Sequence, residues 1–226
     1  MTPDFISLFE PETPDEHGES IWLWRSEAAS PTRARDILTD EEIARVSRLR
    51  DDDQRRRLAA HLCSRKQLLS LLLDAHPGDI SIDYDDDGRP FLPRWPGVRT
   101  SFADSVGWSV LGLSRTAQIG VDVEYVRPVS WKAMLPMISS EDEAQEIRHA
   151  AGEYAAPAAF FRSWTAKEAV LKAEGRGMRG DARRVRLPAG YIHGETSSIT
   201  LEKDGTAYQL DATEAQGTIV ARARRL

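Results

Sequence analysis

Two carboxylates on a short apolar run are the first residues in this sequence that could do chemistry. The run at residues 120–124, GVDVE, alternates apolar and acidic residues, so as a β-strand it would place Asp122 and Glu124 on one face and the two valines on the other. Two acids on a solvated sheet face need no function. The sharper interpretation is a shared divalent cation, because neighbouring carboxylates repel each other unless a positive charge neutralises them.

A second candidate lies about forty residues later, on a segment with strong helical character. Trp164, Glu168 and Lys172 are spaced four residues apart, so they fall along one helix face. The plain interpretation is a surface ion pair worth about 0.3 to 0.5 kcal/mol. Only five of the thirty basic residues are Lys, however, and a compact ammonium suits a phosphate or a proton transfer. The neighbouring Phe160 and Phe161 also indicate that this stripe points inward.

These candidates need elements that position them, and the sequence predicts both helices and strands. Helices are predicted at residues 160–174, with Gly175 as the natural stop, and at residues 53–73. A capping box at residues 39–42 opens a shorter helix, and residues 139–142 open another. The mixture lacks a regular βαβ rhythm, which favours an α+β fold. Strands are predicted at residues 21–25, 80–84, 108–113, 119–123, 185–187, 198–201, 208–212 and 218–223.

The two motifs together carry a family resemblance. GVDVE at residues 120–124 and WTAKEAVLKAEGRG at residues 164–177 resemble the Sfp-type 4′-phosphopantetheinyl transferases. Their pattern is a G-(V/I)-D-(V/I)-E strand and a W-x-x-K-E-(A/S)-x-x-K-x-x-G-x-G helix, and the second motif matches at every defining position. Looser upstream matches are Arg56, the Gly88-Arg-Pro90 turn and Trp108, so the resemblance covers about 130 residues, from about residue 45 to residue 177.

The resemblance implies a fold of two similar α+β halves related by a pseudo-twofold axis, with the active site in the crevice between them. Halving the 226 residues places the boundary near Ser114, a polar break between two predicted strands. We therefore expect an N-terminal half at residues 1–114 and a C-terminal half at residues 115–226 that carries the metal and catalytic motifs. The chain is too long for the trimeric holo-acyl-carrier-protein synthases, which have roughly one half per chain, and two halves in one chain imply a monomer.

The resemblance also implies an activity. It is the transfer of the 4′-phosphopantetheine arm of coenzyme A to a serine of an apo acyl or peptidyl carrier protein, with release of 3′,5′-ADP. Carrier proteins of fatty-acid, polyketide and nonribosomal-peptide biosynthesis are the implied partners.

The resemblance assigns roles to individual residues. Asp122, Glu124 and Glu168 would hold Mg²⁺, a cation that prefers carboxylate and phosphate oxygens. Glu168, or a water that it orients, would take the proton of the incoming serine, and Lys172 would neutralise or protonate the departing 3′,5′-ADP. The basic residues that would grip coenzyme A are Arg56, Arg89 and Lys167.

One segment departs from the family pattern. Where the family has N-x-S-H-S, with the His at the 3′-phosphate of coenzyme A, this chain has SFADS at residues 101–105. Ser105 is expected at coenzyme A, but Asp104 puts a carboxylate, which repels phosphate, in the place of the His. Compensation by Arg99 or Arg57, weaker coenzyme A binding, and a non-catalytic homologue that binds carrier protein or coenzyme A without turnover all remain open. If Asp104 faces the 3′-phosphate, Asp104→His should lower the KM for coenzyme A.

Composition and charge set the outer bounds. The chain has a net charge of −6, which argues against a uniformly basic nucleic-acid-binding face, while its basic stretches at residues 45–65 and 176–186 suit anionic ligands. The single Cys63 excludes an intrachain disulfide, and the five His show no paired spacing. Residues 1–19 form an acidic leader without a signal-peptide core, and no segment approaches the ~18 apolar residues of a membrane span. We expect a cytoplasmic protein with neither nucleic acid nor membrane as a partner.

Overall fold

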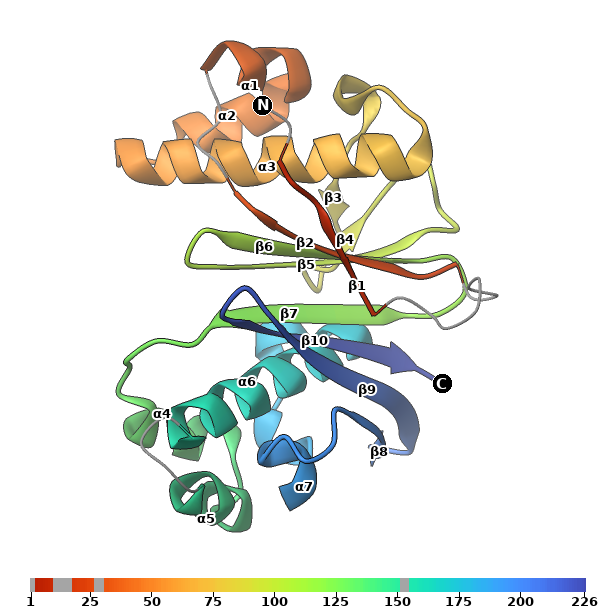
Figure 1. Ribbon diagram of the computed structural model, residues 1–226. Helices are drawn as coiled ribbons and strands as arrows, with labels where there is room; N and C mark the ends of the chain where they lie inside the picture. The colour runs from red at the N-terminus through yellow and green to blue at the C-terminus, as the bar shows by residue number, and fades with distance from the viewer. Residues whose placement is uncertain (1–2, 10–17, 27–30, 151–154) are drawn as a thin grey trace.

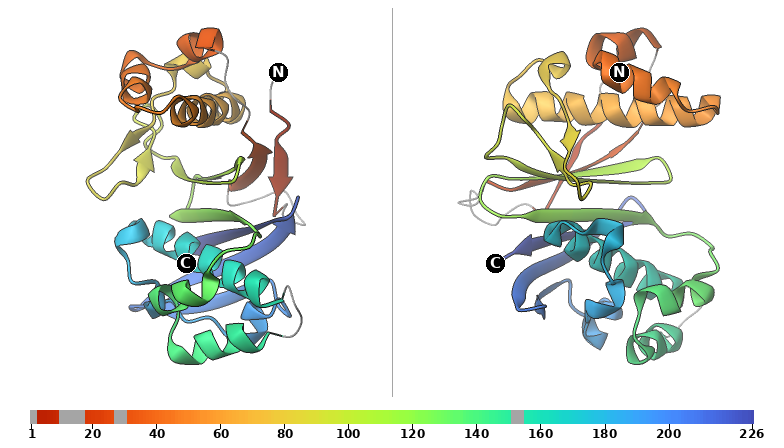
Figure 2. Two further views of the ribbon diagram at one scale, coloured as in Figure 1. Left: turned by 90° about the vertical axis from the view of Figure 1, so that its left-hand side faces the viewer. Right: turned by 180° about the vertical axis from the view of Figure 1, so that it is seen from behind.

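The protein is layered, with two antiparallel sheets stacked between two long helices. The computed structural model describes residues 3–9, 18–26, 31–150 and 155–226. Figure 1 shows the layers from top to bottom: α3 (Asp52–Leu73), a six-stranded sheet, a four-stranded sheet and α6 (Ala155–Glu174). The views from the side and from behind in Figure 2 show the same order of layers. The predicted α+β class is confirmed.

The first sheet is built from residues that precede residue 115. Its strand order is β1-β2-β6-β5-β4-β3, and neighbouring strands run antiparallel. β5 and β6 form a hairpin whose two turn residues, Val106 and Gly107, both have positive φ, as a tight hairpin turn requires. The strands are β1 (Ile6–Leu8), β2 (Ser20–Arg25), β3 (Asp83–Tyr84), β4 (Pro90–Phe91), β5 (Arg99–Ser105) and β6 (Trp108–Ser114).

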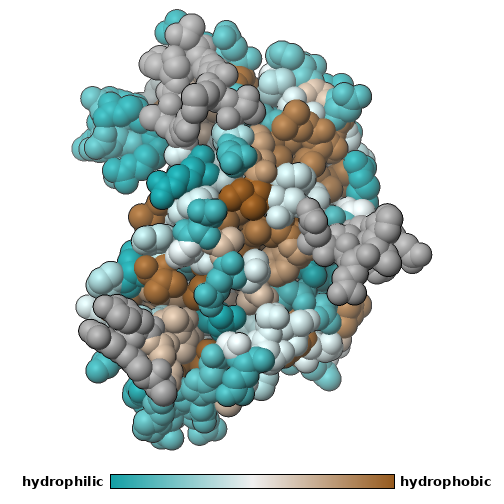
Figure 3. Space-filling model, viewed as in Figure 1, coloured by the Kyte–Doolittle hydropathy of each residue, from teal (hydrophilic) through white to brown (hydrophobic). Residues whose placement is uncertain are grey.

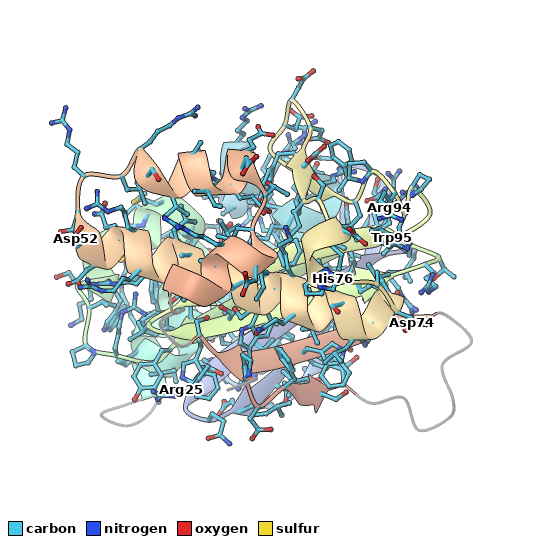
Figure 4. The ribbon with its side chains drawn as sticks, turned by 90° about the horizontal axis from the view of Figure 1, so that it is seen from above. Arg25, Asp52, Asp74, His76, Arg94 and Trp95 are labelled. Carbon is cyan, nitrogen blue, oxygen red and sulfur yellow. The ribbon has the colours of Figure 1, made fainter. Side chains whose placement is uncertain are left out.

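Helices α1 (Pro31–Ile37), α2 (Asp40–Ser47) and α3 form the layer above this sheet. α2 begins with the predicted capping box, in which the Thr39 hydroxyl accepts the Glu42 backbone N–H and the Glu42 carboxylate accepts that of Thr39. α3 packs its apolar side on the sheet around the fully buried Trp24. Figure 4 looks down on α3, whose two ends are marked by the labels Asp52 and Asp74.

The second sheet is built from residues that follow residue 118. Its strand order is β7-β10-β9-β8, again antiparallel throughout. α6 packs against β7 and β10 and stops at Gly175, whose φ of 86° makes it the predicted helix end. The strands are β7 (Ile119–Tyr125), β8 (Ser198–Lys203), β9 (Thr206–Ala215) and β10 (Thr218–Arg225), and the shorter helices are α4 (Trp131–Ile138), α5 (Glu141–His149) and α7 (Ala189–Ile192).

β7 is an edge strand of the second sheet that faces the first sheet, and it determines where the acidic side chains point. Its odd-numbered residues from 119 to 123 are apolar and pack against the first sheet. Its even-numbered side turns towards α6, and Gly120 permits a close approach, because a Cβ there would lie 2.0 Å from the carbonyl oxygen of Ala169. The alternation of the strand thus separates the apolar side from the acidic side.

Several predicted elements differ from the structure. Residues 185–187 are not a strand: Val185 and Leu187 are buried, and the Val185 carbonyl accepts a hydrogen bond from Lys167. The strand predicted at residues 80–84 is reduced to β3, because residues 77–79 form a 3₁₀ turn. β5 was not predicted, since four of its seven residues are Thr, Ser or Asp. Of the predicted leader, residues 6–8 form β1 and residues 1–2 and 10–17 lie outside the described residues.

On the face shown in Figure 3, hydrophobic residues gather towards the middle of the molecule, and polar residues dominate its lower end. Within the described ranges, no helix combines the length and the apolar character needed to cross a bilayer. The large apolar side chains that are exposed are Leu71, Tyr84, Phe91, Val106, Met137 and Leu226.

Candidate active site

The acidic side of β7 meets a lysine of α6 where the strand and the helix cross. Asp122 is 7% exposed, and its Oδ1 accepts a hydrogen bond of 2.7 Å from Lys172 Nζ. The same ammonium donates to the carbonyl oxygens of Val121 and Phe102, so Lys172 links the second sheet to the first. Glu168, one turn earlier on α6, lines the same cavity as Asp122 and Lys172. The structure therefore brings together three residues predicted from the two motifs.

The electrostatics of this cluster are dominated by burial and like charge. Burial raises the pKa of Asp122 to about 7; Lys172 opposes the shift, and the charges of Glu168 and Glu124 add to it. Burial also raises the pKa of Glu168. The charge of Lys172 opposes this shift, and the charge of Glu124 adds to it. Asp122 Oδ2 is buried without a hydrogen-bond partner among the described residues. Asp122 and Glu168 share one ammonium, and the nearby charge of Glu124 adds to theirs, so a further cation would stabilise this cluster.

Glu124 lies at the more exposed end of the acidic face. Its Oε2 accepts hydrogen bonds from the Ser105 hydroxyl at 2.6 Å and from Arg127 Nη1 at 2.9 Å. Ser105 was predicted to contact coenzyme A, but its hydroxyl is used within the protein. Together with Ser101, which accepts the Val121 N–H at 3.0 Å, it joins β5 to the otherwise unpaired edge of β7.

The donor chemistry of the cluster fits a hard divalent cation. No three metal-ligating side chains stand close enough to form a ready-made site in the part of the chain that the structure describes. The three carboxylates nevertheless supply oxygen ligands of the kind that Mg²⁺ prefers, and one of those oxygens, Asp122 Oδ2, is buried and lacks a partner within the described ranges.

A basic cavity of about 310 Å³ opens beside Lys172 and is lined by residues that precede β6 and by residues that follow β7. It is lined by one acidic residue, Asp87, and by two aromatic residues, Phe102 and Tyr84, of which Tyr84 is 41% exposed. Such an excess of positive charge in a concave site favours a polyanionic ligand. The basic lining residues are Arg65, Arg89, Lys172, Arg176 and Arg179.

A second cavity, of about 490 Å³, adjoins the first at Lys172. It contains Asp122 and Glu168 and extends over the apolar side chains of Met137 and Trp164. Lys172 is the one residue that lines both cavities among the described residues. The lysine thus stands where a basic cavity meets an acidic one.

Arg89, next to β4, contacts the C-terminal end of α6 at the wall of the basic cavity. Its Nη2 donates to the carbonyl oxygen of Glu174 at 3.0 Å. Gly175 makes room for this contact, because a Cβ there would lie 1.5 Å from Arg89 Nη2. Arg89 was predicted to bind coenzyme A. It lines the cavity, and two of its guanidinium nitrogens already donate hydrogen bonds within the protein.

Asp104 does not present a free carboxylate to this cavity. Its side chain accepts a hydrogen bond from Arg65 and lies 2.9 Å from His61 Nδ1. Both partners come from α3, so the neutralising charge is not supplied by the candidates suggested by the sequence, Arg99 and Arg57.

Two further residues predicted to contact coenzyme A, Lys167 and Arg56, do not line the basic cavity. Lys167 is 1% exposed, and its ammonium donates to both carboxylate oxygens of Glu143 and to the carbonyls of Ala182 and Val185. It therefore fastens α5 and the segment after α6 to α6. Burial lowers the pKa of Lys167, and Glu143 opposes that shift. Arg56 is largely exposed, pairs with an acid on its own helix and lines a separate groove.

Arg65, His61 and Tyr84 belong to this region but were not predicted as site residues. Arg65 and Lys66 are both buried and interrupt the apolar run of α3, and two adjacent basic residues within such a run are the signal that could have found them. The five His show no paired spacing, so their positions gave no reason to single out His61. No comparable signal marked Tyr84, which lies at the end of a two-residue strand.

Comparison with known proteins agrees with the resemblance. Residues 118–220 match the model of the 4′-phosphopantetheinyl transferase superfamily. The 4′-phosphopantetheinyl transferase HetI of Nostoc sp. is 30% identical over 167 residues, which cover 71% of this chain and 70% of that protein. A putative 4′-phosphopantetheinyl transferase of Synechocystis sp., slr0495, is 28% identical over 73% of this chain and 68% of its own length. The 4′-phosphopantetheinyl transferase ffp of Bacillus subtilis is 25% identical over 62% of this chain and 56% of its own length.

Proposed function

The chain belongs to the 4′-phosphopantetheinyl transferase superfamily, and we propose that it transfers the 4′-phosphopantetheine arm of coenzyme A to a serine of an apo carrier protein. The serine oxygen bonds to the phosphorus that carries the pantetheine, and the bond from that phosphorus to the bridging pyrophosphate oxygen breaks. The hydroxyl proton passes to a base of the enzyme. The products are the holo carrier protein and 3′,5′-ADP.

The place of Lys172 between the two cavities is the observation that carries this proposal. The basic cavity suits the phosphorylated adenosine end of coenzyme A, and Tyr84 offers an aromatic surface there. The pyrophosphate then lies at Lys172, and the pantetheine arm and the carrier serine approach through the second cavity, over Met137 and Trp164.

The acid–base roles follow from the same arrangement. Glu168 takes the proton of the serine, directly or through a water that it orients, and its raised pKa makes it a stronger proton acceptor than an exposed glutamate. Lys172 neutralises or protonates the departing 3′,5′-ADP. The non-catalytic alternative rested on Asp104, and it loses that support because Arg65 neutralises this carboxylate and His61 contacts it.

Mg²⁺ is part of the proposal, with Asp122, Glu124 and Glu168 as the residues that would hold it. When bound, the ion would offset the charge of the pyrophosphate and increase the electrophilicity of the phosphorus. Chelation with EDTA should therefore stop the transfer, and added Mg²⁺ should restore it.

We propose that residues 1–114 and 115–226 act as two halves of one monomer. Each half supplies a sheet and a long helix, and the basic cavity takes lining residues from both. The pseudo-twofold relation between the halves stays a prediction. A site assembled within one chain needs no second copy.

The direct test is incubation with coenzyme A, Mg²⁺ and an apo carrier protein, followed by intact-mass measurement of the carrier. We expect the mass to increase by one phosphopantetheinyl arm. If several carriers stay unmodified while a known transferase loads each of them, the proposed function is wrong.

Glu168→Gln tests the catalytic assignment within this assay. Removal of a general base is expected to lower the rate by about 10²- to 10⁴-fold. Glu202→Gln is the matched control, because Glu202 is exposed on β8 and belongs to the lining of neither cavity. Equal rates for the two variants would exclude Glu168 as the base.

A further inference from the structure

We infer that Asp104 is a positioning residue that fixes the guanidinium of Arg65 in the wall of the basic cavity, with His61 as the second partner of the carboxylate. The inference rests on the proposed function, because it concerns how that cavity holds a phosphate group. It reverses the expectation that a carboxylate at position 104 faces the ligand and repels it.

Both oxygens of Asp104 are occupied by side chains of the protein. Oδ1 accepts a hydrogen bond of 2.6 Å from Ser109 and lies 2.9 Å from His61 Nδ1, and Oδ2 accepts a hydrogen bond from Arg65. Burial alone would raise the pKa of Asp104, but Arg65 first, then His61 and Ser109, lower it to about 2. The carboxylate is therefore ionised at neutral pH, and its charge is directed at α3.

Arg65 is the member of this cluster that reaches the cavity. Its side chain is 10% exposed and lines the cavity, whereas Asp104 and His61 do not. The guanidinium carbon lies 4.9 Å from the centre of the Phe102 ring, which supports one side of its plane. Arg65 Nε is buried and has no hydrogen-bond partner among the described residues. Asp104 thus acts on a ligand through Arg65.

His61 closes the cluster from the other side. It precedes Arg65 by one helical turn, so both side chains leave α3 on the same face. Its Nδ1 also lies 3.0 Å from the Ser109 hydroxyl and 3.1 Å from that of Ser26. A guanidinium held in this way loses little conformational freedom when it binds a phosphate, which is why its fixed position should matter for affinity.

The test uses Asp104→Asn and Asp104→His, with kcat and KM for coenzyme A measured beside the Kd for 3′,5′-ADP. Asp104→Asn should raise both KM and Kd about tenfold or more, the effect of one hydrogen bond to a charged group. The kcat should stay within about twofold, because the groups at the reacting phosphorus are unchanged. Asp104→His should weaken binding as well, whereas relief of a repelling carboxylate would strengthen it.

The exchange of the two partners provides the rescue. In the double variant His61→Asp/Asp104→His, the new carboxylate lies one turn before Arg65 on the same helix face and the imidazole lies opposite. This variant should bring KM to within about threefold of the unmodified protein, because Arg65 again has an anionic partner. A double variant that folds, as judged by its melting temperature, and still binds as weakly as Asp104→His would contradict the inference.

Asp79→Asn is the matched control, since Asp79 approaches Arg94 at 4.0 Å on the exposed surface and should leave KM unchanged. A lower KM for Asp104→His, or an unchanged KM for Asp104→Asn, overturns the inference. A protein that modifies no carrier overturns the proposed function instead. In that case the affinity for 3′,5′-ADP still decides whether Asp104 positions Arg65.

Discussion

Gly120→Ala tests directly how the fold positions the acidic face of β7. An added Cβ would lie 2.0 Å from the carbonyl oxygen of Ala169 and 2.4 Å from the amide nitrogen of Ala173. Both are backbone atoms of α6, so rotation of a side chain cannot relieve the overlap. Ordinary van der Waals contact begins at 3.4 Å, so α6 would have to withdraw from β7 by about 1.4 Å.

That withdrawal acts on the site because α6 also carries Lys172 and Glu168. It would lengthen the Lys172–Asp122 hydrogen bond from 2.7 Å to about 4 Å, beyond hydrogen-bonding distance. Asp122 would then be a buried carboxylate without its counter-charge, and breaking such a pair costs about 3 to 5 kcal/mol. A displacement of Glu168 by about 1 Å can lower the rate by about 10²-fold. We therefore expect stability and transfer to fall together.

Urea unfolding followed by circular dichroism measures the first effect, and the rate of carrier modification on the same preparation measures the second. Gly97→Ala is the control, because no atom lies within 4 Å of its added Cβ and its φ is not positive. Gly97→Ala should change the free energy of unfolding by less than about 0.5 kcal/mol. If Gly120→Ala were as stable and as active as Gly97→Ala, the close approach of α6 would not be what positions the site.

Three further changes probe other contacts. Lys167→Met leaves Glu143 buried without its partner and should lower the free energy of unfolding in urea by about 3 to 5 kcal/mol. Adding Glu143→Gln to the same chain should recover part of that loss. If nothing were recovered, the buried ion pair would not be the cause of the loss. The pKa of Asp104 is lowered from 3.8 to about 2, so its ion pairs stabilise the fold above pH 4 and cease to do so as the pH falls through 2. The stability difference between the unmodified protein and Asp104→Asn should therefore shrink between pH 4 and pH 2, and a constant difference would argue against ionic pairing. Gly175→Ala should lower the melting temperature more in the unmodified protein than in the Arg89→Ala variant, because the added Cβ meets the Arg89 guanidinium. Equal losses of melting temperature in the two backgrounds would exclude that contact.

Local patterns predicted the elements that carry the acidic and basic motif residues. The alternation of residues 120–124 decides which side chains face α6, and that depends only on strand geometry. The spacing of Glu168 and Lys172 depends only on the helix period. Such features appear in sequence because each is decided within a few residues. The capping box at Thr39 was predictable for the same reason.

Contacts between distant segments could not be read in this way. β5 has few apolar residues because two of its serines bond to the edge of β7, so its pattern does not identify it as a strand. From the sequence alone, Asp104 was expected to repel phosphate, because its partners on α3 could not be identified. Arg65, for example, lies 39 residues earlier in the chain. The same limit applies to residues 185–187, whose apolar side chains are buried beside Lys167 without strand pairing.

The lysines show how the structure sharpens an argument from composition. Their scarcity pointed to α6, and four of the five make ion pairs with a carboxylate. Three of these ammonium groups, those of Lys66, Lys167 and Lys203, belong to side chains that are at most 2% exposed. A compact ammonium with three donors can be satisfied in such a space, whereas a guanidinium would need partners for five. Lysine in this Arg-rich chain therefore marks buried cation sites in general. Lys172 differs from the three because its side chain is 25% exposed and lines both cavities, and that access is what singles it out for the reaction.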